Sequence, residues 1–329
     1  MTQAPTTTTA GRQRLFSLLR ILLSLCLICV LLHFVDVKHV GEALVNANPL
    51  LICVALSWLF LDRVVMAYRW DVLLRAKNIF VPLVELTKIY FIGSFWGLFL
   101  PSNLAPDAVR VYLAARTRSH HTSEMFSSVF IDRFVGMAVL MGLAGIAVFI
   151  LITLHQATLG FSASAVVIAG SLSLPVIFWL WGKLPGPEAL PFHIAGRFGE
   201  KFRQLYASCH AYRQERGLLV KVALLAVISH SGAILMVYVL SLALGFRVGI
   251  LYFFLLVPLI TVVTMLPVSL GGVGVQEGTF VYFFSLIGVP LSGALALSLL
   301  LRVLSIVASL PGGFFSLSRG GYQLAENLR

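Results

Sequence analysis

Long apolar runs separated by short basic segments make up most of this chain, and their lengths predict membrane-spanning helices. A helix needs about 20 consecutive apolar residues to cross the hydrocarbon core of a bilayer. Runs of this order recur from one end of the sequence to the other, so we expect an all-α, polytopic membrane bundle with about six full spans. The expected spans are residues 15–34, 49–68, 124–153, 162–182, 218–244 and 290–316.

Two further apolar stretches, 84–116 and 250–288, are interrupted by breaks rich in proline or glycine at 100–107 and 266–277. Non-helical backbone survives at membrane depth only where it is buried in protein or lines a wet cavity. Stretch 84–116 also has basic residues at both ends, so a helix that crossed the membrane there would leave one basic cluster on the wrong side. We therefore expect both stretches to form re-entrant helical hairpins.

The distribution of lysine and arginine orients these elements. The span 49–68 exits into Arg69, Arg75 and Lys77, and basic residues also gather in the segment 183–217. Loops rich in lysine and arginine face the cytoplasm. We place this segment and both tails, 1–14 and 317–329, in the cytoplasm.

With this orientation, the first hairpin enters from the cytoplasm and the second from the exterior. Both breaks begin with the pattern Leu-Pro-x-x-Leu. The halves 15–182 and 218–316 are therefore expected to form an inverted repeat, an arrangement that places transport sites near broken helices.

The composition agrees with a membrane protein. The 329-residue chain is 59% hydrophobic and 11% charged, and its mean hydropathy of +0.96 lies outside the range of soluble domains. The net charge of +11 sits in short segments between apolar runs, where it sets topology, so we expect no nucleic-acid partner. We expect an inner-membrane protein that is surrounded by anionic lipid.

Cysteines and histidines give no indication of a metal or redox site. The four cysteines fall in apolar runs or in the basic segment, and the histidines lack a second ligand at metal-binding spacing. The glycines at 271–274 lack the Lys-Ser/Thr of a P-loop, which excludes nucleotide binding there. We expect neither a metal nor a cofactor.

Ionisable residues inside the predicted spans and hairpins are the candidates for function. Each costs about 2.5–3.5 kcal/mol at the bilayer centre, so each should pair with another or line a wet cavity. They are Asp62, Arg63, Asp107, Arg110, Asp132, Arg133, Glu277 and Arg302. We name those from Asp107 onward as candidate substrate contacts, together with Ser102 and Asn103 of the first break.

Asp107 and Arg110 stand one helical turn apart, so both face one side of a helix that begins there. The amino terminus of such a half-helix, together with Arg110, can bind a phosphate, although the helix dipole alone also favours an acid at this position. The neighbours Asp132 and Arg133 fit either a structural salt bridge or a substrate contact.

Glu277 follows a run of glycines that lets the chain turn before a new helix. It is either an ordinary N-terminal carboxylate or a proton or cation site. Arg302 has no acid near it in sequence, so its counterion must come from elsewhere in the bundle, and Glu277 is the first candidate. The expected backbone hinges are Pro101, Pro267, Gly271, Gly272 and Gly274. The GxxxG spacing of Gly93 and Gly97 would let another helix approach closely.

Four motifs together resemble the lysylphosphatidylglycerol synthase transmembrane (flippase-like) family. They are residues 93–102, Asp107 with 110–112, residues 132–136, and Pro267 with 271–278. The resemblance covers residues 15–316 as a single domain and implies a bundle with re-entrant helices that moves an anionic or modified lipid between leaflets. Ala105 and Pro106 stand where the family usually has glycine. Bifunctional members add an aminoacyl-transferase domain, and this chain stops soon after its last span, so we expect no synthase activity.

The leading hypothesis is a flippase for an anionic phospholipid or a polyprenyl-phosphate-linked lipid, and not an enzyme. Arginine suits such a substrate because its guanidinium binds phosphate through two hydrogen bonds. One alternative is an intramembrane polyprenyl-pyrophosphate phosphatase, although the clustered glutamates expected for metal-assisted hydrolysis are missing from the sequence. Another is a non-transporting accessory protein of cell-envelope glycosylation, whose basic loop 197–216 docks a cytoplasmic enzyme or anionic lipid.

Overall fold

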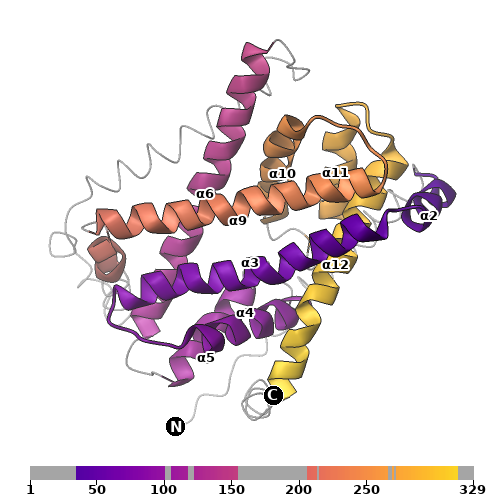
Figure 1. Ribbon diagram of the computed structural model, residues 1–329. Coiled ribbons are helices and arrows are strands. Elements are labelled where there is room, and N and C mark those ends of the chain that lie inside the picture. The colour runs from indigo at the N-terminus through magenta and orange to yellow at the C-terminus, as the bar shows by residue number, and fades with distance from the viewer. Residues whose placement is uncertain are drawn as a thin grey trace, which may run out of the picture.

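The protein consists of long helices and shorter helices between them (Figure 1). The computed structural model describes residues 35–100, 105–117, 122–154, 206–212, 215–265, 269 and 272–317, and across these ranges it contains helices and no strand. The principal helices are α2 (Val37–Val45), α3 (Pro49–Arg75), α4 (Leu83–Gly97), α5 (Ala105–Thr117), α6 (Thr122–Thr153), α9 (Arg216–Ala243), α10 (Ile250–Met265), α11 (Val275–Ser285) and α12 (Leu291–Leu317). The expected all-α fold is confirmed.

Four of these helices, α3, α6, α9 and α12, are long and apolar enough to cross a membrane. They contain between 27 and 32 residues and coincide with four of the expected spans. A multi-pass membrane protein is therefore confirmed. The spans expected at 15–34 and 162–182 lie outside the described residues.

Local chemistry sets the ends of α3. The helix begins where the side chain of Asn48 accepts hydrogen bonds from two amides of the first turn and Pro49 occupies the first helical position. It continues to Arg75 instead of ending at residue 68, as the hydropathy pattern predicted. The extension is stable because its residues pack inward, and Trp70 is fully buried.

Each expected break separates two packed short helices. Across the first break, α4 and α5 lie antiparallel, with Pro106 filling the space that Gly93 and Gly97 leave; a Cβ on Gly97 would lie 2.6 Å from Cγ of Pro106. Across the second, α10 packs against α11, and Gly272 and Gly274 adopt φ angles of 72° and 82°, which favour glycine. The remaining predicted residues of the breaks lie outside the described ranges: Pro101, Ser102, Asn103, Pro267 and Gly271.

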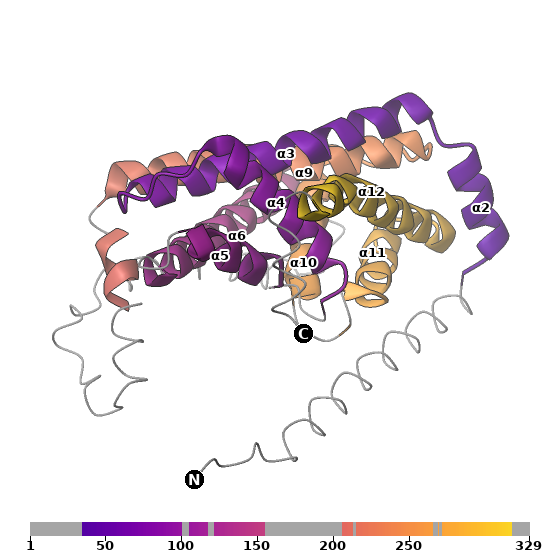
Figure 2. The same ribbon diagram turned by 90° about the horizontal axis from the view of Figure 1, so that it is seen from below.

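The two halves of the chain run in opposite directions. Helices α3 and α9 lie side by side and antiparallel (Figures 1 and 2). At one end, the amide of Asn48 donates to the carbonyl of Ala243 at 2.9 Å. At the other end, the hydroxyl of Tyr212 donates to the carbonyl of Leu73 at 3.0 Å. Each half contains a long helix, two short helices and a second long helix, in that order.

Equivalent helices of the two halves have equivalent neighbours. The first short helix of each half packs against the last long helix of the other, α4 against α12 and α10 against α6. The same correspondence relates α5 and α6 to α11 and α12, and α3 and α4 to α9 and α10. The helices of the two halves are therefore paired in the same pattern.

Part of the basic segment belongs to the folded bundle. Residues 206–212 are helical, and both Cys209 and Tyr212 are buried. The ammonium of Lys77 lies 4.5 Å from the ring centre of Tyr212, and burial raises the pKa of the Cys209 thiol to about 11. These contacts therefore hold the residues before α9 against the end of α3.

We expect Gly312→Ala to lower stability by about 1–3 kcal/mol, the usual cost of adding a methyl group to a well-packed site. A Cβ on Gly312 in α12 would overlap the carbonyl group of Phe91 in α4. The measurement is the thermal unfolding midpoint of the purified protein in detergent. The control is Gly142→Ala in α6, where an added Cβ would have nothing within 4 Å apart from its chain neighbours and the backbone of its own helix. Equal effects of the two substitutions would contradict the close contact of α4 with α12.

Candidate functional site

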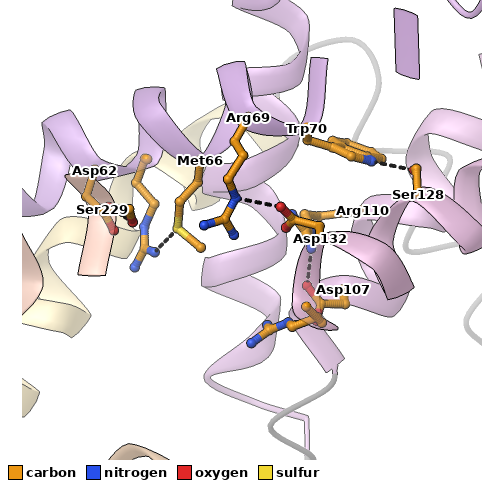
Figure 3. A network of polar contacts seen from close by, with 11 residues as sticks. Asp62, Met66, Arg69, Trp70, Asp107, Arg110, Ser128, Asp132 and Ser229 are labelled. Carbon is orange, nitrogen blue, oxygen red and sulfur yellow. Dashed lines mark hydrogen bonds and ion pairs between the residues drawn. The ribbon is translucent and has the colours of Figure 1, made fainter. Parts of the chain in front are cut away.

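Asp107 of the first hairpin is the centre of a network of charged side chains (Figure 3). It is the third residue of α5 and only 8% exposed. One carboxylate oxygen accepts a hydrogen bond from Arg110, one turn later in the same helix, and the other accepts from Nε of Arg133 in α6. The expectation that Asp107 and Arg110 share a helix face is confirmed, and Asp107 also joins α5 to α6.

A second ion pair joins α3 to α6. Nε of Arg69 lies 2.5 Å from Oδ1 of Asp132, and both side chains are at most 3% exposed. Asp132 and Arg133 are successive residues and point in different directions from α6. Each therefore pairs with a different helix, and the two do not form one salt bridge with each other. Arg69, interpreted from sequence as marking the cytoplasmic exit of a span, is instead a buried partner in this site.

Aromatic rings hold the guanidinium of Arg110. Its Cζ lies 4.3 Å from the ring centre of Tyr90 in α4 and 5.3 Å from that of Trp70 in α3, distances at which a cation is attracted to a π face. Trp70 in turn donates through Nε1 to the hydroxyl of Ser128 in α6, at 2.8 Å. Helices α3, α4, α5 and α6 thus all position this one cation.

These residues form what we call the arginine cluster, defined as Arg69, Arg110, Arg133, Asp107 and Asp132. It carries three cations against two carboxylates. Nη1 of Arg69 and both Nε and Nη1 of Arg110 are buried with no hydrogen-bond partner in the described part of the chain. Unpaired buried donors and a surplus positive charge both cost free energy. An anionic group that accepted these hydrogen bonds would relieve both costs.

The second hairpin carries an ion pair of its own. Oε1 of the buried Glu277 lies 2.5 Å from Nε of Arg302 in α12, and Oε2 accepts from the amide of Gly274 at 2.7 Å. Nη2 of Arg302 also donates to the carbonyl of Gly272 at 3.2 Å and to Oε1 of Gln276 at 3.4 Å. Glu277 is therefore confirmed as the counterion of Arg302, and it also satisfies an amide at the start of α11.

The ion pairs of the two hairpins occupy equivalent positions. Asp107 and Glu277 are each the third residue of the second short helix of their half. Arg133 and Arg302 are each the twelfth residue of the long helix that follows. Both arginines donate through Nε. The correspondence between the two halves therefore extends to the charged side chains.

The other two charged residues predicted in the membrane, Asp62 and Arg63, lie in α3. Asp62 accepts a hydrogen bond from the hydroxyl of Ser229 in α9, and Nη1 of Arg63 lies 4.0 Å from Sδ of Met66 (Figure 3). Across the ranges that the structure describes, no three His, Cys, Asp or Glu side chains gather in a group that could hold a metal ion.

Comparison with known proteins supports the resemblance inferred from the four motifs. The family model of the lysylphosphatidylglycerol synthase TM region matches residues 17–312. A UPF0104 membrane protein of Pyrococcus horikoshii is 23% identical over 323 residues, which cover 91% of this chain and 96% of that protein. UPF0104 membrane proteins of Methanothermobacter thermautotrophicus and Methanocaldococcus jannaschii are 24% and 20% identical, with 88% and 92% of this chain and 91% and 94% of those proteins covered. No solved structure matches the chain.

We expect Arg69→Met and Asp132→Leu each to destabilise the protein by about 3–5 kcal/mol, because each leaves the other charge buried and unpaired. The double variant removes both charges and should be more stable than either single variant. Thermal unfolding in detergent, analysed as a double-mutant cycle, measures the coupling.

The control for this cycle is Arg247→Met. Arg247 lies between α9 and α10 and is exposed, so the expected change is within about 0.5 kcal/mol. Simple addition of the two single effects in the double variant would contradict a coupled buried pair.

Proposed function

We propose that this chain, which belongs to the family of the lysylphosphatidylglycerol synthase TM region, moves a phosphate-bearing lipid between the two leaflets of its membrane. The observation that carries the proposal is the arginine cluster, in which three guanidinium groups, two of them buried, face two carboxylates within a bundle of apolar helices. The substrate class is an anionic phospholipid or a polyprenyl-phosphate-linked lipid. The protein acts as a transporter and not as an enzyme.

The geometry of the arginine cluster fits a phosphate group. A guanidinium presents its donors in a planar fork that matches two phosphate oxygens, and such charge-assisted bonds are stronger than neutral ones. The side chain of Arg133 is 37% exposed, whereas those of Arg69 and Arg110 are 3% exposed. A phosphate that enters the site meets Arg133 first and then reaches the unpartnered donors of Arg110.

The short helices support a route through the middle of the membrane. Helices α4, α5, α10 and α11 contain 15, 13, 16 and 11 residues, so each is about 16–24 Å long. The hydrocarbon core is about 30 Å thick, so each hairpin is re-entrant, entering and leaving on one side. Because α3 and α9 are antiparallel, the two hairpins enter from opposite sides.

The equivalent ion pairs give the transporter two alternating contacts. A phosphate that takes the guanidinium of Arg133 from Asp107 weakens the contact between α5 and α6, whereas Glu277 and Arg302 keep α11 against α12. Release on the other side requires that Arg133 return to Asp107 and that the contact between α11 and α12 weaken. The lipid head therefore moves past one hairpin at a time, while the acyl chains stay in the hydrocarbon.

The basic residues give the orientation. Arg75 and Lys77, at the end of α3, and the basic segment 183–217 lie on the cytoplasmic side of the inner membrane. The first hairpin then opens to the cytoplasm and the second to the exterior. Both tails are cytoplasmic.

We expect Arg110→Ala to reduce lipid exchange at least about tenfold, because loss of a hydrogen-bonded charged contact to phosphate costs about 1.5–3 kcal/mol. The measurement is the leaflet exchange of a fluorescent anionic phospholipid in liposomes that contain the purified protein. The control is Arg75→Ala at the exposed end of α3, with exchange expected near the wild-type rate. Equal rates of lipid exchange by wild type and by the double variant Arg110→Ala, Glu277→Gln would contradict the proposal.

The same liposomes distinguish the alternative functions. Release of inorganic phosphate from a polyprenyl pyrophosphate would favour the phosphatase hypothesis. Exchange by neither wild type nor variants, with a glycosyltransferase retained by the basic loop, would favour the accessory protein.

Cysteine accessibility tests the opposite entry of the two hairpins. In a chain whose four native cysteines are replaced by serine, we expect Val84→Cys and Thr117→Cys, at the two ends of the first hairpin, to react with a membrane-impermeant maleimide from one face only. Ile250→Cys and Leu286→Cys, at the ends of the second hairpin, should react from the opposite face only. Labelling of Val84→Cys and Thr117→Cys from different faces would show that residues 84–117 cross the membrane.

A further inference from the structure

Asp62 lies at the centre of the helix pair that joins the two halves. It is the fourteenth of 27 residues in α3, and Ser229 is the fourteenth residue of α9. The hydroxyl of Ser229 donates to Oδ1 of Asp62 (Figure 3). Equivalent positions of two antiparallel helices therefore meet at this hydrogen bond. Both helices are long enough to cross a membrane, so the carboxyl group lies near the middle of the bilayer.

The two helices are in close contact beside this hydrogen bond. A Cβ on Gly232 in α9 would overlap the indole ring of Trp58 in α3. The side chain of Asp62 itself is only partly buried. The site therefore has a fixed geometry and is not closed off by the protein.

Asp62 differs in its partner from the four acids of the described long helices and hairpins that lie within ion-pair distance of an arginine. These are Asp71, Asp107, Asp132 and Glu277. Among the described residues, the hydrogen-bond partner of Asp62 is instead the neutral hydroxyl of Ser229. A carboxylate with only a neutral partner in an apolar bundle is costly.

The arginines nearest to Asp62 in sequence are directed elsewhere. Arg63 extends Nη1 toward Sδ of Met66, and Arg69 binds Asp132. Both nevertheless interact electrostatically with a charge on Asp62. The titratable and charged side chains on the helices that pack against α3 are Glu85, Lys88 and Tyr90 of α4, Glu124, Asp132 and Arg133 of α6, Arg216, Lys221, His230 and Tyr238 of α9, and Arg302 of α12.

We propose that Asp62 is a proton-binding site and that its protonation strengthens anion binding at the arginine cluster; the second part rests on the proposed function. A hydroxyl suits both states of the acid, because it donates to a carboxylate and accepts from a carboxylic acid. The proton can therefore bind to and leave a carboxyl oxygen of Asp62 while the contact with Ser229 is kept. Reversible protonation needs no rearrangement of α3 against α9.

Electrostatics links this proton to the lipid. When Asp62 takes up a proton, the bundle loses a negative charge that acts on Arg63 and Arg69, so the positive surplus that attracts a phosphate grows. By thermodynamic reciprocity, a bound phosphate favours the proton by the same factor. One proton then accompanies one monoanionic lipid, and the two cross as a neutral pair.

Infrared difference spectroscopy tests the proton site without reference to transport. Spectra of the purified protein in lipid nanodiscs, taken at high and low pH, report the C=O stretch of a protonated carboxylic acid. We expect a band that is lost in Asp62→Asn and retained in Asp36→Asn, the control at the exposed start of α2. Ser229→Ala should keep the band but move it to higher frequency, because the acid loses a hydrogen bond.

Two spectroscopic results would overturn the proton site. One is a band that persists unchanged in folded Asp62→Asn. The other, which decides the matter if Asp62→Asn does not fold, is a band whose frequency is the same in wild type and Ser229→Ala.

Liposomes with an imposed pH gradient test the coupling. One coupled proton per lipid changes the wild-type exchange ratio by up to about tenfold for one pH unit, and Asp62→Asn should be insensitive to the gradient. Exchange that ignores the gradient in wild type overturns the coupling, even if the infrared band is assigned to Asp62. No exchange under any gradient overturns the proposed function and, with it, the coupling, but leaves the spectroscopic result standing.

Discussion

A charged side chain among apolar helices needs a partner, and this requirement shapes the site and the helix contacts around it. Arg69 with Asp132 ties α3 to α6, Arg133 with Asp107 ties α5 to α6, and Arg302 with Glu277 ties α11 to α12. Hydrophobic packing gives little preference for one helix neighbour over another when lipid is equally apolar. The ion pairs, which connect particular residues, therefore specify contacts within each half, whereas close packing without ion pairs in the described part of the chain joins α3 to α9, α4 to α12 and α6 to α10.

The two halves share an architecture but have diverged in chemistry. At the positions of α9, α11 and α12 that correspond to Arg69, Arg110 and Asp132 stand Met236, Phe280 and Leu301. Phe280 is buried and stacks on Phe284 with ring centres 5.5 Å apart. The second half thus has one ion pair in an apolar setting. The first half has a charged cluster in which three buried hydrogen-bond donors have no partner in the described part of the chain. For the proposed function, this asymmetry makes the first half the main site for the anion.

The sequence predicts the parts of this structure that depend on local pattern. Apolar runs located the described spans, and prolines and glycines located the breaks. Glu277 was predicted as the counterion of Arg302 because each is an isolated charge in an apolar segment. Arg69 was missed because an arginine at the end of an apolar run looks the same whether it faces the cytoplasm or is buried. Its burial depends on Asp132, 63 residues further along the chain. For the same reason, the sequence did not show that the adjacent residues Asp132 and Arg133 pair with different helices, α3 and α5.

The exchange of contacts between halves determines how the bundle can move. Because α4 packs against α12 and α10 against α6, each hairpin rests on a long helix of the opposite half. Gly312 and Gly313 bring α12 close to Phe91 and Phe95 of α4, and such packed surfaces slide or rotate as units more readily than they deform. In the transport cycle proposed above, a rotation of one half about the α3–α9 contact would therefore carry these packed surfaces as units. Packing would then couple the two hairpins to each other, while the ion pairs of Asp107 and Glu277 would determine which hairpin opens.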